Sequence, residues 1–251
     1  MKQTLYRNID LLRIPIKAGI AEYYFPQNVD WAACKVEKIV ACIPNAACVD
    51  PYDGTTPVLN VGSVTDLYFN LYSAEQKELL HAVSVEQLLH VNNNPVLLNS
   101  QLDLSLCNLY FTTAPAADAT LLLYVYHDSK IVDEDLPERT VTLEFDLAAN
   151  QEINLQDIIT TYIHALPAKV RGIMFWTGVS NPAYFTLRDY KQTYVLQNLH
   201  SELARPNMNG GAAWDSQAYT MLFDKIDIDF QYSHIREAAG QTSHQKITIL
   251  Y

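Results

Sequence analysis

The chain contains an internal repeat, and this feature limits most strongly how it can fold. The segment TDLYFNLYSAEQKELL (65–80) aligns without a gap with the segment NPAYFTLRDYKQTYVL (181–196). A Tyr-Phe-x-Leu motif falls on a Tyr-Phe-x-Leu motif, and two apolar residues close each segment. Such a repeat predicts two copies of one structural unit.

Each half of the chain shows the same order of predicted elements around this segment. An alternating strand opens each half (11–17 and 140–147), and a strand with a Val-x-x-Ile pattern follows (35–43 and 169–177). The Tyr-Phe-x-Leu strand comes next. Apolar residues near one face then predict an amphipathic helix over 73–90 in the first half and over 189–204 in the second. A long alternating strand (96–111 and 218–235) and a closing strand (120–127 and 245–251) complete each half.

The repeat therefore predicts a mainly β protein with two tandem domains, 1–129 and 130–251. Each is expected to be a β-sandwich of the jelly-roll or Greek-key type with one helix inserted among its strands. The charged, proline-containing segment HDSKIVDEDLPERT (127–140) is the expected junction. The largest difference between the halves is a loop at 44–64, where the second half has only GVSNP (178–182), and loops accept such insertions at low cost.

Composition excludes several classes of function. The formal net charge is −11, both halves are acidic, and no basic stripe is present, so we expect no direct nucleic-acid partner. The N-terminus has no apolar run of signal-peptide length, and no stretch reaches membrane-span length, which predicts synthesis in a cytosol. The four cysteines lack metal-finger spacing and are expected to be reduced thiols in or near the cores.

The sequence offers no catalytic motif. It has no phosphate-binding glycine loop, no G-x-S-x-G, no H-E-x-x-H and no C-x-x-C, and only 8 glycines in all. No two of the seven histidines lie within two positions of each other, so the H-x-H pair of a metal-binding double cupin is absent. We therefore expect a protein that is not an enzyme, with no catalytic residue and no cofactor.

Three aspartates are the first candidates for a metal site. Asp224, Asp227 and Asp229 lie in FDKIDIDF (223–230), and a hard cation such as Ca²⁺ prefers several carboxylate oxygens. The favoured alternative is the solvated face of a half-buried strand whose Ile226 and Ile228 point inward. The segment VDPYDG (49–54) is interpreted first as a turn and only second as a ligand loop. Tyrosine-rich segments such as LYVY (123–126) and QYSH (231–234) fit either core packing or a subunit interface.

With its paired LYFNL…KELL and AYFTL…TYVL segments, the whole chain resembles the double jelly-roll major capsid proteins. It is most similar to the coat proteins of tailless, membrane-containing icosahedral bacteriophages of the corticovirus and finnlakevirus type. This resemblance implies a homotrimer with six near-equivalent outer faces, which fills a pseudo-sixfold position in a virion shell. Neighbouring capsomers, minor capsid or penton proteins and an internal lipid membrane would be its partners.

The resemblance also suggests local roles. The loop 44–66 would be a tower or an intersubunit lock, and interfaces between subunits could hold structural Ca²⁺. Lys2, Arg7 and Arg13 would approach lipid headgroups.

Two alternatives stay open. A two-domain β-sandwich that binds carbohydrate or a receptor, like a spike or lectin, would use NNNP (92–95) and NMNGGAAWD (207–215), which contains Trp214. A minor capsid or penton protein of the same virus is the other, although pentons usually have a single jelly roll.

Overall fold

The computed structural model describes residues 2–5, 8–44, 47–60, 66–89, 98–127, 130–133, 140–162, 170–175, 182–204 and 222–251. These residues form a mainly β protein with sandwich-like sheets, as predicted. The chain divides into two compact units, which we call the N-unit (Asp10–Asp128) and the C-unit (Met1–Ile9 with Ser129–Tyr251). The predicted domain ranges, 1–129 and 130–251, stay a prediction; the compact units differ from them by grouping residues 1–9 with the C-terminal half.

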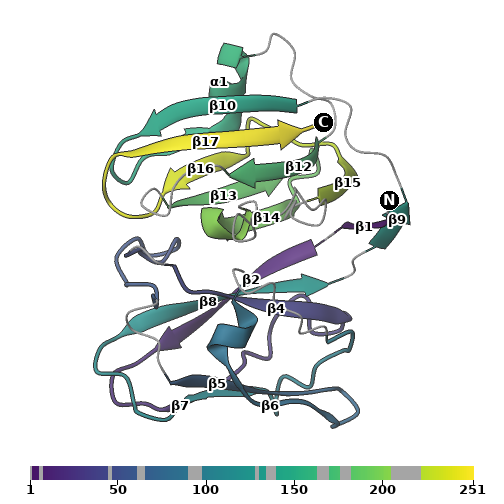
Figure 1. The fold of residues 1–251 in the computed structure, drawn as a ribbon, viewed down its shortest axis with the longest axis vertical. Helices are drawn as coiled ribbons and strands as arrows, with labels where there is room; N and C mark the ends of the chain where they lie inside the picture. Colours follow the sequence, from purple (N-terminus) through teal and green to yellow (C-terminus); the bar gives the residue numbers. More distant parts are fainter. Residues whose placement is uncertain are drawn as a thin grey trace, which may run out of the picture. The chain divides into compact units, whose positions relative to one another are not determined.

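The N-unit contains two sheets, with strand orders β2-β8-β4 and β3-β7-β5-β6 (Figure 1). Ile14 of β2, Val125 of β8 and Phe69 of β5 belong to one buried apolar cluster, so both sheets contribute to a single core. The elements are β2 (Asn8–Ile16), β3 (Glu22–Tyr24), β4 (Val36–Cys42), β5 (Leu67–Tyr72), β6 (Glu78–Ser84), the 3-10 helix η1 (Val85–Leu88), β7 (Asn108–Phe111) and β8 (Ala119–His127).

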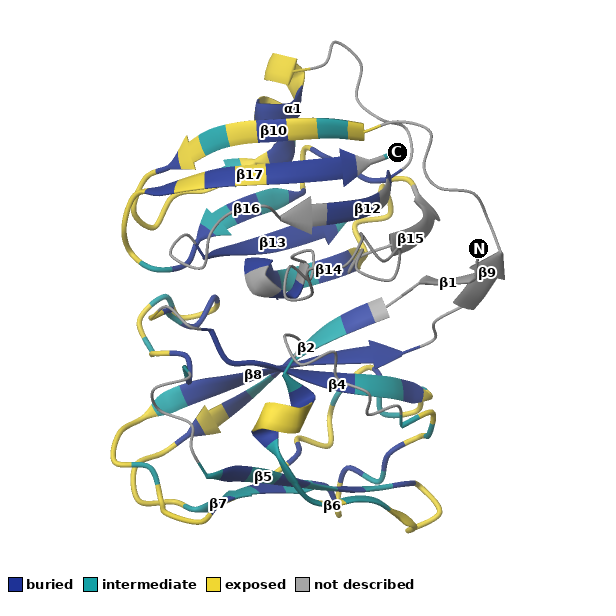
Figure 2. Cartoon of the chain, in the orientation of Figure 1, coloured by how far each residue is buried: buried dark blue, intermediate teal, exposed yellow. Residues whose placement is uncertain are grey.

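The C-unit also contains two sheets, with strand orders β10-β17-β12-β15 and β11-β16-β13-β14, and a short ribbon of β1 with β9. Buried and exposed residues alternate along β10 and along most of β17, which gives that sheet one apolar face (Figure 2). The elements are β1 (Lys2–Leu5), β9 (Lys130–Asp133), β10 (Thr140–Leu147), β11 (Glu152–Asn154), α1 (Leu155–Tyr162), β12 (Val170–Phe175), β13 (Ala183–Arg188), β14 (Tyr194–His200), the 3-10 helix η3 (Ser201–Ala204), β15 (Leu222–Ile226), β16 (His234–Glu237) and β17 (Ser243–Leu250).

The two units pair their strands in the same order and in the same register. Strand β2 neighbours β8 in the N-unit as β10 neighbours β17 in the C-unit, and β3-β7-β5-β6 corresponds strand by strand to β11-β16-β13-β14. Even the single bridge between Val36 and Ser100 has a counterpart, between Val170 and Ile226. Further corresponding pairs are Ile39–Val125 with Ile173–Ile249, Tyr23–Leu109 with Ile153–Ile235, and Phe69–Leu109 with Phe185–Ile235.

The repeated sequence segment is a β-hairpin in both units. Its paired residues are Tyr68–Ser84, Phe69–Val83, Leu71–Leu80 and Tyr72–Glu78 in the N-unit, and Tyr184–His200, Phe185–Leu199, Leu187–Leu196 and Arg188–Tyr194 in the C-unit. The register shifts at the same two places in both hairpins. The positive φ angles also correspond, with 60° at Gln76 and 63° at Gln192, and with 49° at Ala82 and 47° at Asn198.

The predicted helices over 73–90 and 189–204 are therefore wrong. Most of each range is the second strand of the hairpin, and only η1 and η3 are helical turns. A β-bulge explains the error. Leu80 and Val83 face two residues of β5 that are two positions apart, so the bulged strand has three positions where its partner has two. The bulge thus produces the i, i+3 spacing of apolar residues that is typical of a helix.

The predicted long strands over 96–111 and 218–235 are also wrong, because each contains a turn. In the N-unit the turn begins at Asp103, whose carbonyl accepts hydrogen bonds from the backbone N–H groups of Leu106 and Cys107. In the C-unit it begins at Asp229, whose carbonyl accepts one from the N–H of Tyr232. Each turn carries the chain from one sheet of the unit to the other, so residues on either side of it belong to different sheets.

Sequence patterns did not indicate α1, the one α-helix of the described residues. Leu155, Ile158 and Ile159 are its buried residues, and the positions i, i+3 and i+4 define one apolar stripe. The other predicted strands are confirmed as β2, β4, β5, β8, β10, β12, β13 and β17, and so is the free, mostly buried state of the four cysteines. The strands β1, β3, β9 and β11 were not predicted.

Candidate functional surfaces

The structure gives the three candidate metal-ligating aspartates different surroundings. Asp224 belongs to β15, and its side chain lies outside the described part of the chain. Asp227 is exposed and follows the end of β15, while Asp229 starts the turn. The Asp229 carboxylate accepts hydrogen bonds from the Gln231 N–H at 3.2 Å and from the Gln192 amide at 3.0 Å. A calcium site at these residues stays a prediction. Within the described residues, no three His, Cys, Asp or Glu side chains gather closely enough to hold a metal ion.

A buried carboxylate anchors the loop that only the N-unit carries. Asp50 is fully buried and forms an ion pair with the guanidinium of Arg13, whose Nε lies 3.0 Å from Asp50 Oδ2. The same oxygen accepts a hydrogen bond from the Thr120 hydroxyl at 2.8 Å, and Asp50 Oδ1 accepts one from the Tyr52 N–H at 2.9 Å. Arg13 also lies over the Tyr52 ring at 4.4 Å. These contacts occupy Arg13, one of the three cations predicted to meet lipid, and the side chains of Lys2 and Arg7 lie outside the described residues.

The tip of the same loop is a turn, as predicted for VDPYDG. The Asp53 carboxylate accepts hydrogen bonds from the hydroxyl and the N–H of Thr56 at 2.6 and 2.8 Å, and from the N–H of Thr55 at 2.8 Å. These donors, the Thr56 hydroxyl first, hold the pKa of Asp53 well below its ordinary value. The loop residues 47–60 are thus fixed at their base by Asp50 and at their tip by Asp53, and the Tyr52 side chain between them is exposed.

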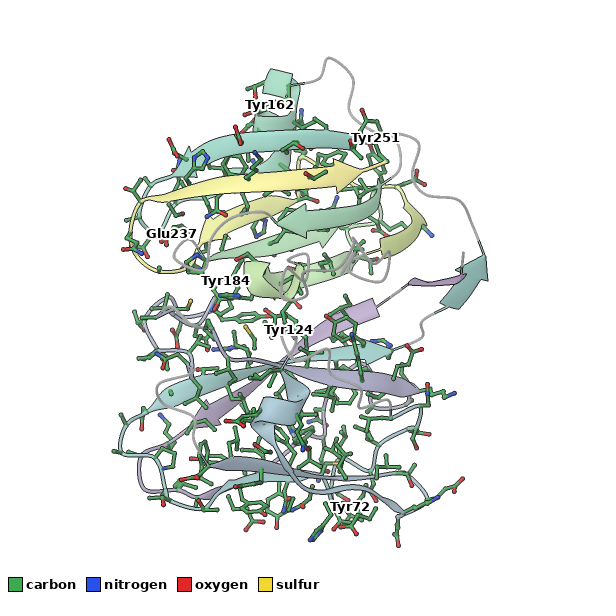
Figure 3. The ribbon with its side chains drawn as sticks, in the orientation of Figure 1. Tyr72, Tyr124, Tyr162, Tyr184, Glu237 and Tyr251 are labelled. Carbon is green, nitrogen blue, oxygen red and sulfur yellow. The ribbon has the colours of Figure 1, made fainter. Side chains whose placement is uncertain are left out.

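Other buried polar groups also serve the fold. Glu237 is buried in the C-unit, and its carboxylate accepts hydrogen bonds from three backbone N–H groups, those of Asn150, Ala239 and Gly240, at 2.5–3.0 Å (Figure 3). In the N-unit, His127 Nε2 lies 2.8 Å from Asp10 Oδ2. These two carboxylates therefore have partners within their own units and support the local structure.

The exposed residues at the end of each repeated hairpin are the most informative surface. We call Tyr72–Glu78 with Asp103–Cys107 the N-tip, and Arg188–Tyr194 with Asp229–Ser233 the C-tip. The tips share their backbone hydrogen bonds. The Ser73 N–H donates to the Lys77 carbonyl at 2.8 Å, as the Asp189 N–H donates to the Thr193 carbonyl at 3.1 Å.

A side chain of the turn holds the first strand of the hairpin in both tips. The Tyr72 N–H donates to the Cys107 sulfur at 3.3 Å, and the Arg188 N–H donates to the Ser233 hydroxyl at 3.0 Å. The main chains of the two tips are therefore equivalent, and the tips differ in their side chains.

The C-tip presents three exposed tyrosines where the N-tip has other residues. Tyr190, Tyr194 and Tyr232 are 65%, 42% and 52% exposed. The corresponding residues of the N-tip are Ala74, Glu78 and Leu106. The sequence alone is consistent with either core packing or an interface role for the tyrosine of QYSH. Tyr232 in this segment is exposed, whereas Tyr124 and Tyr126 of LYVY are buried. Aligning the two turns of the repeat would have revealed this difference.

Two predictions, of sugar-binding segments and of no membrane span, involve residues that the structure does not fully describe. The predicted sugar-binding segments 92–95 and 207–215, with Trp214, lie outside the described residues. Among the residues that are described, no helix combines the length and the apolar character needed to cross a bilayer.

Comparisons with known proteins give two distant structural similarities. No known protein family and no curated protein matches the sequence. The chain aligns with the major capsid protein P2 from Bacteriophage PM2 at 11% identity and a TM-score of 0.23, over 99% of this chain and 96% of that chain. It aligns with a chain from the atomic structure of Sulfolobus Turreted Icosahedral Virus at 12% identity and a TM-score of 0.23, over 97% and 90% of the two chains. TM-scores at this level do not establish a shared fold.

Proposed function

We propose that the chain is the major capsid protein of an icosahedral virion and that each unit is a jelly roll. The observation that carries the proposal is the nested strand pairing, repeated in register in both units. Apart from the β1–β9 ribbon, the first strand of each unit neighbours the last (β2 with β8, β10 with β17) and the second neighbours the second-to-last (β3 with β7, β11 with β16). This is the order expected for a chain that folds back on itself as a long double ribbon. Each unit then crosses between its sheets at a turn that begins with an aspartate.

Two equivalent units in one chain suit the tiling of a surface. A trimer of such chains has six similar lobes and can fill a position with six neighbours, although its true symmetry is threefold. We propose that the chain forms this homotrimer, that trimers contact neighbouring capsomers and minor capsid proteins, and that one face approaches an internal membrane. No residue is catalytic in this proposal.

The loop 47–60 is the proposed projecting element of the capsomer. It belongs to the N-unit alone, and the buried Asp50 fixes its base while the hydrogen-bonded Asp53 fixes its tip. A loop fixed at its base and its tip loses little conformational entropy when it contacts a neighbour, so it can contribute to an interface at low cost.

The mass of the purified chain in solution tests the proposal. Light scattering should give three times the chain mass of 28.4 kDa at micromolar concentration, and electron microscopy should show particles with hexagonal outlines or closed shells. A monomer that binds immobilised glycans would contradict the proposal and support the spike- or lectin-like alternative.

A further inference from the structure

The two tips carry opposite charges at one equivalent position. Lys191 of the C-tip corresponds to Glu75 of the N-tip, and both lie in the exposed turn of the hairpin. In the described part of the chain, neither side chain forms an ion pair. The backbone is the same in both turns, so folding of the turn does not require either charge.

Arg188 of the C-tip adds a second cation that lacks a carboxylate partner among the described residues. Its guanidinium lies 4.1 Å from the centre of the Tyr194 ring and donates a hydrogen bond to the Tyr194 hydroxyl. Its Nε atom is buried and has no hydrogen-bond acceptor in the described part of the protein. The buried Nε is out of reach of another chain, but the terminal N–H groups of the guanidinium can still donate hydrogen bonds to a carboxylate.

The aspartates of the C-tip do not neutralise these cations. Asp189 Oδ1 accepts hydrogen bonds from the backbone N–H groups of Lys191 and Thr193 at 2.9 and 2.8 Å. Asp229 accepts from Gln231 and Gln192. Both carboxylates therefore brace the turns, while Tyr190 and Tyr232 contribute exposed aromatic surface of the kind that is enriched in protein interfaces.

The N-tip has the complementary chemistry. It carries Glu75, which has no ion-pair partner in the described part of the chain, and the exposed Glu78, whose carboxylate lies 2.7 Å from His81 Nδ1. Leu106, which corresponds to Tyr232, is 40% exposed and supplies an apolar contact beside these acids. One lysine, Lys77, lies in the same turn, so the formal charge of this turn is negative overall.

We propose that the C-tip of one chain docks on the N-tip of a second copy, with Arg188 and Lys191 facing Glu75 and Glu78. The inference deepens the proposed capsid function and rests on it for the assembly of many copies. Each chain carries both surfaces, so the contact is head-to-tail and joins copies into rings or open arrays. A contact between two hairpin ends is small, and its strength comes from repetition within an assembly.

Reciprocal charge reversal tests the contact in the full chain. Sedimentation velocity over a concentration series at low salt compares wild type with Lys191→Glu, Glu75→Lys and the double variant. Each single variant places like charges across the contact and should weaken association about 10-fold, whereas the double variant restores the pair and should return to within about 3-fold of wild type. The control variants are Lys35→Glu and Asp30→Lys, which reverse exposed charges outside the tips and should leave association unchanged. Thermal melts show whether every variant folds.

The outcomes separate this inference from the proposed function. The docking would be overturned, and the capsid proposal would stand, if trimers and shells formed equally well in both single variants. The same conclusion would follow if the two losses of association added up in the double variant. Open arrays that form in wild type and in the double variant, but not in the single variants, would support the docking and count against a closed shell. Anionic vesicles that bind wild type but not Lys191→Glu, with self-association unchanged, would assign the C-tip to lipid and overturn the docking. A wild type that stays monomeric at the highest concentration would overturn both proposals.

Discussion

The hydroxyl of Tyr162 bonds to both backbone polar groups of Glu144. It accepts a hydrogen bond from the Glu144 N–H at 2.9 Å and donates one to the Glu144 carbonyl. Glu144 lies in β10, a terminal strand of its sheet, and Tyr162 is the last residue of α1 (Figure 3). Unpaired groups on a terminal strand can pair with a strand of another chain. The tyrosine therefore protects the edge of the sheet at this residue.

Tyr162→Phe should remove this protection and keep the ring. We expect the free energy of unfolding to fall by about 1 kcal/mol, because the lost hydrogen bonds lie near the surface where water replaces them. Chemical denaturation measures the loss, and binding of an amyloid dye during slow heating reports new strand pairing. Tyr24→Phe is the matched control, since Tyr24 is also exposed. Equal behaviour of the two variants would contradict a protective role of the Tyr162 hydroxyl.

Ala82→Asn should stabilise the N-unit. Ala82 has a φ of 49°, in the left-handed region that alanine adopts at a cost, and the equivalent residue of the C-unit is Asn198 with a φ of 47°. Asparagine tolerates this region better, so the free energy of unfolding should rise by about 0.5–1 kcal/mol. The reciprocal change Asn198→Ala should lower it. A loss of stability on Ala82→Asn in a urea titration would show that the new side chain does not fit the bulge.

Cys107→Ser should be tolerated, whereas Cys107→Ala should not. The Cys107 sulfur accepts a hydrogen bond from the Tyr72 N–H, and the equivalent Ser233 accepts one from the Arg188 N–H. Serine keeps an acceptor at this position. Alanine leaves the Tyr72 N–H without one and should lower the free energy of unfolding by about 1–3 kcal/mol. Denaturant midpoints of the two variants give the comparison, and equal losses would contradict a role for the sulfur as an acceptor.

Lys38 should make the stability of the protein depend on pH in the alkaline range. Burial of its ammonium group lowers the pKa of Lys38 to about 8 from the ordinary 10.5, and its ammonium lies 4.5 Å from the centre of the Tyr126 ring. Between these two values the unfolded chain binds the proton and the folded chain does not. The free energy of unfolding therefore rises with pH across this window, by roughly 3 kcal/mol if no other group titrates.

Lys38→Met isolates this contribution. The variant should be more stable than wild type at pH 7, and the difference should shrink as the pH rises from 8 to 10.5. Cys107 acts in the opposite direction, because burial raises the pKa of its thiol to about 11 and favours unfolding above pH 9. Only the difference between the two proteins in urea titrations at each pH is therefore informative. A difference that does not change with pH would contradict a shifted pKa at Lys38.

Much of the fold follows from the sequence, because the repeat and the period-two alternation are local properties of the chain. The strands around Ile14, Ile39 and Leu143 have one apolar side, and a pattern of alternate residues predicts them directly. Leu80 and Val83 misled the prediction because a bulge gives a strand the apolar spacing of a helix. The turns at Asp103 and Asp229 were not predicted, because the alternation of apolar residues continues on both sides of each turn.

The candidate surfaces were harder to predict. Tyr190 and Tyr232 are far apart in the sequence, and only the pairing of hairpin and turn brings them to the same end of the C-unit. Asp224, Asp227 and Asp229 form a compact cluster in the sequence, but a strand end and a turn separate their roles. Short sequence distance was a poor guide to both sites, because strand pairing in these sandwiches is mostly non-local.

The bulge in the hairpin is held by different side chains in the two units. Asn70 accepts a hydrogen bond from the Ala82 N–H through its amide oxygen at 2.8 Å, and Thr186 accepts one from the Asn198 N–H through its hydroxyl at 3.1 Å. The backbone shape is thus the same while the atoms that support it have changed. Either an amide oxygen or a hydroxyl oxygen can therefore hold the bulge, so this position of the hairpin requires an acceptor rather than one particular side chain.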